Sequence, residues 1–208
     1  MSRWVDHPTV STNPDTPSFK ARGRGKGDKE QNRNKRTVRL RLLPNSSQER
    51  RLRKLADAAA RLWNELNYAR LMQYRASGKI DFKGTEHEFY HKYNSVLGVH
   101  AGQVIRLNNS AWKSYFELLR LYKQGKLPRF YGKPSPPGFW KDRLLGKREL
   151  RILVRNDRYY LEPTNGGEGY IVLKDWGLKI KYAGRIKWAG KQGMLTIKLE
   201  DNLSLIHI

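Results

Sequence analysis

One strand-like segment stands alone before a long helical block, and the next strand-like segments come only after that block. TVRLRLLP at 37–44 alternates apolar and basic residues, which indicates a half-buried strand that ends at Pro44. Apolar residues then recur at steps of three and four over 45–126, and the period returns to two over 148–202. A strand needs a hydrogen-bonded neighbour, and only the later segments can supply one. The order therefore predicts an α+β fold: a small antiparallel, OB-like β-barrel interrupted by an inserted helical lobe.

The helical block divides into segments with recognisable ends. A capping box at 46–49 predicts the start of a first helix, which continues to about Gly78. Thr85 and Glu88 form a second capping box and predict a second helix from Thr85. A third apolar stripe predicts a helix at about 101–123, with Gly125 at its C-terminal cap.

The remaining segments are connectors and ends. Residues 127–147 are rich in Pro and aromatic residues and predict a connector, and Asn156 with Asp157 predicts the turn of a β-hairpin. Residues 1–36 are rich in Pro, Gly, Ser and Asn and include RGRGKG, so we expect a disordered basic arm. That arm is either a phosphate-binding tail or a solvated leader, and the sequence leaves both readings open.

The charge balance restricts the class of partner. The chain has 42 Lys and Arg against 19 Asp and Glu, a net charge of +23, and 11% aromatic residues. Cations neutralise phosphates and aromatic rings stack on unpaired bases, so the composition favours nucleic acid over a membrane. There is no apolar run of transmembrane length and no cysteine, so we expect no membrane partner, no disulfide and no Cys-based zinc site here. The expected location is a prokaryotic cytoplasm, in association with the nucleoid.

Two groups of polar residues are candidates for nucleic-acid contacts. Amide side chains can form paired hydrogen bonds with adenine edges, although amides between helices can equally bond to protein. Arg39, Arg41, Lys179 and Lys181 alternate with apolar residues on strands and could hold phosphates, unless they only face water. The amides that lie among apolar helical positions are Asn64, Asn67, Gln103 and Asn108.

The aromatic residues also fall into two groups, one proposed to contact bases and one expected in the core. Phe139 and Trp140 lie in the connector beside Lys141 and are candidates for base stacking. Trp112, Tyr115 and Phe116 lie within the third predicted helix, and we expect them in the core.

One catalytic pattern is present. His87-Glu88-Phe89-Tyr90-His91 matches HExxH, in which two His one turn apart bind zinc and the Glu activates water. No third ligand falls at an expected spacing, so a zinc metalloprotease is a remote alternative. We expect no catalytic and no metal-binding residue in this chain.

Four segments of the chain resemble the TnpB family, transposon-encoded RNA-guided DNA nucleases, and in particular its archaeal-type members. They are RTVRLRLLPNSSQERRLRKLADAAARLWNELN, AWKSYFELLRLYKQGKLPRFYGKPSPPGFWKDR, LRILVRNDRYYLEP and LKIKYAGRIKWAGKQGMLTIKLED. The resemblance implies a wedge barrel with an inserted recognition lobe that holds the guide RNA and the target DNA with its adjacent motif. It places Arg39 and Arg41 on the first strand, Asn64 on the first recognition helix and Lys113 in AWKSYF. It leaves the oligomeric state open.

The family's catalytic part has no counterpart here. In the family, a RuvC-like domain with three acidic residues follows the barrel and carries a Cys zinc ribbon, so we expect Mg²⁺ and structural Zn²⁺ only there. The chain would then be the N-terminal half of a nuclease and inactive alone. The alternative is a non-catalytic binding module, either a transposon regulator or an RNA chaperone.

The last six residues, LSLIHI at 203–208, differ in character from the basic strands before them. The codons CTG TCT CTT ATA CAC ATC would encode these residues, and that DNA sequence resembles the end of a library-preparation adapter. We therefore expect the native reading to stop near Asn202. A natural apolar strand that leads into a further domain is the alternative.

Overall fold

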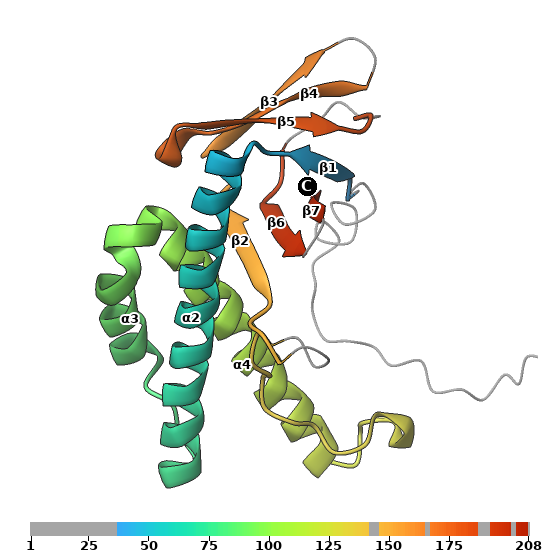
Figure 1. Cartoon of the computed structure of the whole chain (residues 1–208). Helices are drawn as coiled ribbons and strands as arrows, with labels where there is room; N and C mark the ends of the chain where they lie inside the picture. Colours follow the sequence, from blue (N-terminus) through green and yellow to red (C-terminus); the bar gives the residue numbers. More distant parts are fainter. Residues whose placement is uncertain (1–36, 142–145, 165–166, 187–191, 201–202, 208) are drawn as a thin grey trace, which may run out of the picture. The chain divides into compact units, whose positions relative to one another are not determined.

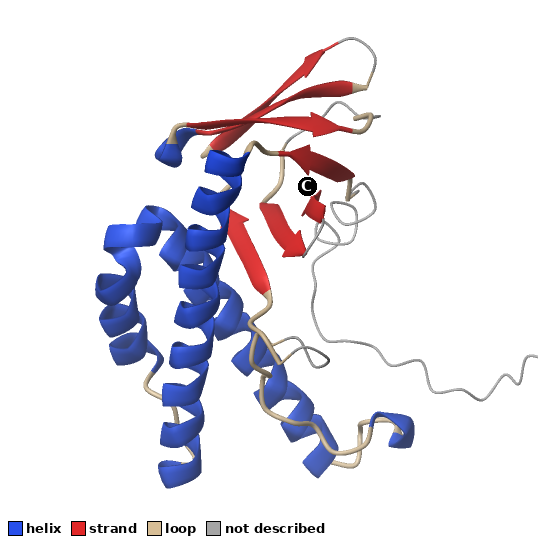
Figure 2. Ribbon diagram, in the orientation of Figure 1, coloured by secondary structure: helices blue, strands red, loops and turns tan. Residues whose placement is uncertain are grey.

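The computed structural model of the chain describes residues 37–141, 146–164, 167–186, 192–200 and 203–207. These residues fall in a unit that runs from Thr37 to Ile208. The basic arm expected at 1–36 lies outside the described residues. Within them, helices and an antiparallel sheet occur together (Figure 2), which confirms the predicted α+β class.

The strands form one antiparallel sheet of order β2-β6-β7-β1-β5-β4-β3. The lone first strand pairs with two later ones, β5 and β7, as the order of the segments predicts. Figure 1 shows β3, β4 and β5 side by side, in agreement with their pairing. The strand bounds are β1 Arg39–Leu43, β2 Leu150–Val154, β3 Tyr159–Thr164, β4 Glu168–Leu173, β5 Leu178–Ala183, β6 Leu195–Glu200 and β7 Leu203–His207.

The predicted hairpin at Asn156 and Asp157 is wrong. β2 pairs with β6 and β3 pairs with β4, so consecutive strands lie at opposite edges of the sheet. The corner at 155–158 joins those edges and can span at most roughly 18 Å, so the edges approach each other there. Among the described strands, however, no pairing joins β2 to β3. The sheet is open at this place, and the closed OB-like barrel is not found.

The helical insertion consists of α2 (Ser46–Ser77), α3 (Phe82–Leu97) and α4 (Ala101–Lys123). The predicted span of α4 is confirmed. α2 begins with a capping box formed by Asn45 and Gln48, one residue before the predicted box, and ends at Gly78 in the left-handed conformation. α3 begins with Asp81 as its cap and not at Thr85, because Thr85 is buried and its hydroxyl donates to the Asp81 carbonyl. No helix in the described part of the chain is long and apolar enough to span a membrane.

The core lies between α2 and the inner face of the sheet. Figure 1 shows α2 running beside β2, with α3 and α4 next to α2. Leu40 and Leu42 of β1 point into this core, and so does Tyr182 of β5. Tyr182 needs Gly169 opposite it, because a Cβ there would lie 2.5 Å from the tyrosine oxygen and from the Glu162 carbonyl. One core therefore joins the insertion and the sheet.

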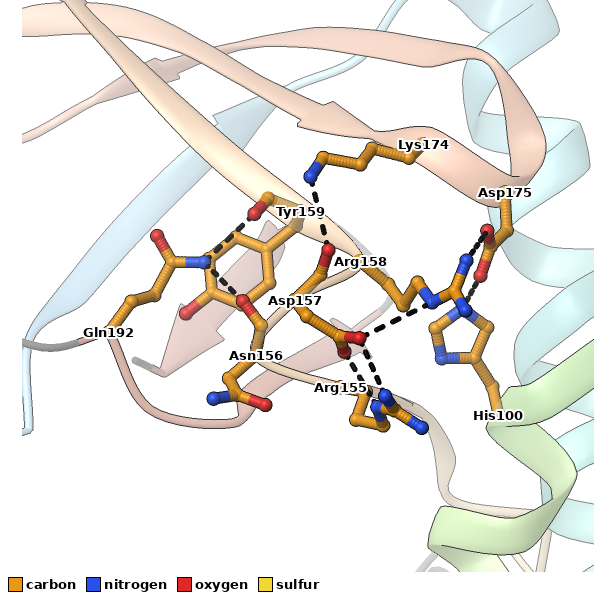
Figure 3. Close-up of polar contacts among 9 residues, drawn as sticks. All are labelled: His100, Arg155, Asn156, Asp157, Arg158, Tyr159, Lys174, Asp175 and Gln192. Carbon is orange, nitrogen blue, oxygen red and sulfur yellow. Dashed lines mark hydrogen bonds and ion pairs between the residues drawn. The ribbon is translucent and has the colours of Figure 1, made fainter.

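A chain of polar groups marks the junction between the insertion and the sheet (Figure 3). His100, at the start of α4, has its Nε2 atom 2.9 Å from the Asp175 carboxylate, which follows β4. Arg158 lies 3.3 Å from the same carboxyl group and 3.6 Å from Asp157, which in turn pairs with Arg155 at 2.6 Å. Burial lowers the pKa of His100 and outweighs the opposing effect of Asp175, so the imidazole is neutral at neutral pH.

Strand β7 consists of the segment expected to be a translated adapter. It pairs with β6 and β1 in the middle of the sheet. A short apolar segment can form a strand whatever its origin, because strand formation depends on the surface it pairs with. The adapter interpretation therefore stays a prediction.

Candidate nucleic-acid interface

The outer face of β1 carries two arginines. Arg39 and Arg41 are exposed, while Leu40 and Leu42 between them are buried, as the alternation predicts. Among the described side chains, no carboxylate lies within 4.0 Å of either guanidinium. The two guanidinium groups can therefore each bind a phosphate group without first breaking an ion pair to a described carboxylate.

The outer face of β5 carries two lysines in different surroundings. Lys179 lies 2.6 Å from Glu162, and Lys181 lies 2.7 Å from Glu168, and all four side chains are substantially exposed. The hydrogen bond that each lysine donates to its glutamate raises the pKa of that lysine. Lys179 also lies 4.8 Å from the centre of the Tyr170 ring. The β5 lysines face outward as expected, but each has an acidic neighbour that neutralises its local charge.

Asn67 and Asn108 lie inside the helical insertion, where both are fully buried. The Asn67 amide donates to the Pro137 carbonyl at 2.8 Å, and its oxygen accepts from the Trp112 indole at 2.9 Å and from Asn108 at 3.4 Å. Neither amide has a free, exposed edge in this structure, so neither is placed to read a base. Both amides instead form hydrogen bonds with other parts of the protein, which is the alternative to base recognition.

Arg70 completes this buried network. Its guanidinium donates to Asn108 at 2.8 Å and to the Thr85 hydroxyl at 3.1 Å, and it lies 4.8 Å from the centre of the Phe82 ring. Burial lowers the pKa of Arg70 to about 10, while Glu86 opposes this shift. Arg70 thus stays charged at neutral pH and joins α2, α3 and α4 from within.

Asn64 and Trp140 bind each other through the connector backbone. The Asn64 oxygen accepts from the Trp140 amide at 2.8 Å, and its nitrogen donates to the Trp140 carbonyl at 3.4 Å. The Trp140 ring stacks on Trp63, with 4.8 Å between ring centroids, and the Arg151 guanidinium lies 4.6 Å from the Trp140 centroid. Trp140 is only 5% exposed, so its ring is covered by protein in this structure, and a stacking role on a base stays an untested prediction. Trp140 anchors the connector to α2.

The other predicted contact residues remain open to solvent. Phe139 is 45% exposed, Lys141 and Lys113 are exposed, and Gln103 is half-buried on α4. Trp112 and Tyr115 are buried in the core, as expected, and Phe116 is half-buried beside them. The nucleic-acid roles of the exposed residues stay predictions.

Two exposed residues of the connector were not singled out from the sequence. Phe130 is 82% exposed and Tyr131 is 64% exposed. Their position among cations in a Pro-rich segment is the signal that could have identified them.

The HExxH residues lie on an exposed face of α3. The Nε2 atoms of His87 and His91 are 3.2 Å apart, and both rings face solvent. Across the described ranges, no group of three or more His, Cys, Asp or Glu side chains could hold a metal ion. The zinc protease alternative thus has two of its ligands and lacks a third among these residues.

Comparison with known proteins adds one relative. No family model matches the chain. It is, however, 47% identical over 168 residues to the TnpB-like protein ORF457 of Acidianus two-tailed virus. The chain belongs to the TnpB family. The matched region covers 81% of this chain and 36% of the viral TnpB-like protein, so the chain spans about a third of that relative's length.

Proposed function

We propose that this TnpB-family chain is the nucleic-acid-binding half of an RNA-guided DNA endonuclease of a mobile element. In this role it holds a guide RNA and the target DNA beside its adjacent motif. The observation that carries the proposal is the pair of outward arginines on β1, exposed and without a described acidic partner. The net charge of +23 and the TnpB-like relative support it.

The β1 arginines suit phosphate binding for a chemical reason. A guanidinium presents donors in a planar fork that matches two phosphate oxygens, and it stays charged at every physiological pH. Contacts to the backbone fix the position of a strand but read no sequence. In the proposed function, base pairing by the guide RNA therefore supplies most of the sequence specificity.

The helical amides have a supporting role in this proposal. Asn64, Asn67 and Asn108 hold the helices and the connector together, so they shape the surface that meets nucleic acid. Gln103, Lys113, Phe139 and Lys141 remain available for direct contacts. The curled, open sheet then acts as the wedge that the family resemblance implies.

The metals of the family do not fit this chain. It has no cysteine to hold a structural Zn²⁺, and the described residues contain no cluster of acidic side chains for Mg²⁺. We propose that both metals belong to a catalytic part of a longer protein, which acts in the cytoplasm close to the nucleoid. This chain alone then binds RNA and DNA and cleaves neither.

A two-step binding experiment tests the proposal. The chain is titrated with a structured guide RNA by fluorescence anisotropy, and the complex is then titrated with single-stranded DNA that matches or mismatches the guide. We expect strong RNA binding that weakens steeply with salt, and retention of the matched DNA only. Failure to bind RNA at 50 mM salt would contradict nucleic-acid binding, and equal retention of both DNAs would contradict the guided role.

Two further observations separate the binding half of a nuclease from an independent binding module. Mg²⁺-dependent cleavage of guided DNA by this chain alone would contradict the proposed division of labour. Sequencing the source DNA through the codon for Asn202 would decide between the two functions. A frame that continues into acidic RuvC-like motifs and paired cysteines supports the nuclease, and a stop after LSLIHI supports the regulator or RNA chaperone.

A further inference from the structure

The connector after α4 exposes a pair of aromatic rings. Phe130 is 82% exposed and Tyr131 is 64% exposed. Large apolar side chains that are exposed together usually mark an interaction site. Phe130 is more exposed than any other large hydrophobic residue in the described ranges, which makes this segment (residues 126–133, the aromatic tip) a candidate interaction surface.

The aromatic tip holds its rings in a defined arrangement. The centroids of the Phe130 and Tyr131 rings are 4.4 Å apart, and the ring planes are inclined by 33°. The two residues lie in a 3₁₀ turn, Arg129–Tyr131, in which the Tyr131 amide donates to the Pro128 carbonyl at 3.1 Å. The Lys126 amide donates to the Leu121 carbonyl at 2.9 Å, which ties the start of the tip to α4. A restrained pair of rings loses little conformational entropy when a flat ligand stacks on it.

The charge around the rings identifies the class of ligand. From Lys113 to Lys141, with both included, the chain has seven Lys and Arg and a single acidic residue, Glu117. Glu117 is already paired with Arg120 at 2.6 Å. The surroundings therefore favour a polyanion, and exposed rings among cations favour one whose flat bases are accessible. In a duplex the base faces are covered by their neighbours, so a single strand fits better than a duplex.

We propose that Phe130 and Tyr131 stack on an unpaired base of single-stranded nucleic acid, while Lys126 and Lys133 contact the flanking phosphates. The inference rests on the proposed function and adds a second contact surface, separate from the β1 arginines. Single-stranded RNA and single-stranded DNA share the necessary chemistry. The experiment below distinguishes them.

The test compares the wild-type chain with F130L/Y131L, which keeps apolar bulk but removes both aromatic faces. Anisotropy titrations use a single-stranded DNA, an RNA of the same sequence, the corresponding duplex and an abasic strand of equal length. Stacking on one base predicts about a tenfold loss of affinity for the single strand with bases. The abasic strand and the duplex should bind both proteins equally, and the salt dependence should not change, because no charge is removed.

Two control variants keep the result interpretable. F130W/Y131W retains aromatic faces and should restore the affinity. Tyr68→Leu removes a ring that is 58% exposed on α2, outside the aromatic tip, and should leave every affinity unchanged. The melting temperatures of all variants should agree, because the altered side chains are exposed.

Each outcome is decisive. Unchanged affinity of F130L/Y131L for both single strands would overturn the inference while leaving the proposed function intact. An equal loss on the abasic strand would also overturn it, since stacking cannot act without a base. A loss on RNA alone or on DNA alone would support the inference and identify the strand that the aromatic tip contacts. Failure of the wild-type chain to bind any probe would instead contradict the proposed function.

Discussion

The polar side chains inside the helical insertion and those on the outer face of the sheet have opposite surroundings. Asn67 and Asn108 are fully buried, and their amide groups bond to other parts of the protein. Arg39 and Arg41 lie on β1 with their charges in water. The hydrogen bonds of the first group hold the fold together, whereas the guanidinium groups of the second remain exposed to solvent.

A second difference exists within the sheet face. The β1 arginines have no described acidic neighbour, whereas the β5 lysines pair with Glu162 and Glu168. An exposed ion pair adds little to stability, but it cancels the local charge that would attract a phosphate. Binding strength should therefore follow the unpaired cations and not the number of outward basic residues.

Replacement of Asn67 should have the largest effect, and it should affect stability. Asn67→Ala leaves the Trp112 indole, the Pro137 carbonyl and one Asn108 donor without a partner inside the protein. The free energy of unfolding, measured in urea, should fall by about 3 kcal/mol. The exposed Asn94→Ala on α3 should change it by less than about 0.5 kcal/mol. A stable Asn67→Ala protein with weakened RNA binding would show that the amide reads a base after all.

Replacement of the β1 arginines should affect binding and not stability. R39Q/R41Q should weaken RNA binding by roughly 50-fold at 0.1 M salt and reduce the slope of log K against log salt by between one and two. The salt titration is compared with K79Q/K83Q, which removes the same charge from exposed Lys79, just before α3, and exposed Lys83, in its first turn. If both variants lost the same slope, the β1 arginines would contribute only through the net charge of the chain, and a specific phosphate contact on β1 would be contradicted.

Removal of the carboxylates that pair with the β5 lysines should leave β5, like β1, with cations that lack an acidic neighbour. E162Q/E168Q frees Lys179 and Lys181, and RNA affinity should rise by about fivefold, with a steeper salt dependence. E86Q/E88Q removes two exposed carboxylates from α3 and serves as the matched control. If the two variants gained equally, the gain would reflect net charge, and the pairing on β5 would have no local role.

The smallest effect should arise where the two regions join, and it should depend on pH. Burial lowers the pKa of His100, while Asp175 and Asp157 act to raise it and Arg158 acts with burial. The neutral imidazole is thus favoured in the folded chain, and the proton is favoured in the unfolded chain. The contribution of His100 to the free energy of unfolding is fully present above the pKa of an unfolded histidine, near 6.5. It is lost as the pH falls from there toward the lower pKa that His100 has in the folded chain.

His100→Gln should remove this part of the pH dependence. Urea denaturation of the wild type and His100→Gln at pH 7.0 and 5.5 gives the comparison. The wild type should lose more stability between the two pH values than the variant. A parallel loss in both proteins would place the titrating group elsewhere.

The periodicity of the sequence was sufficient for most of the architecture. Alternation identified β1 and its buried Leu40 and Leu42, and the apolar stripe identified α4 with its bounds. Both signals are local, because a half-buried element must repeat its apolar residues at its own period. The pairing of β1 with later strands followed from the need of every strand for a neighbour.

Side-chain partners were harder to predict, because they depend on how the connector returns to α2. Trp140 lies far from Trp63 in the sequence, so nothing local reveals that their rings stack. The turn at Asn156 has the composition of a hairpin, but the strands that flank it pair elsewhere. Local turn chemistry indicates that the chain bends, whereas the choice of strand partner is made by the whole sheet.

Cross-linking tests the contrast between the two regions most directly. The chain is bound to an RNA that contains a photoreactive uridine analogue, irradiated, and digested for identification of the cross-linked residues by mass spectrometry. We expect cross-links on the outer face of β1 and at Phe130 and Tyr131 of the aromatic tip. Cross-links at Asn67, Asn108 or Trp140, with none on β1, would contradict this expectation.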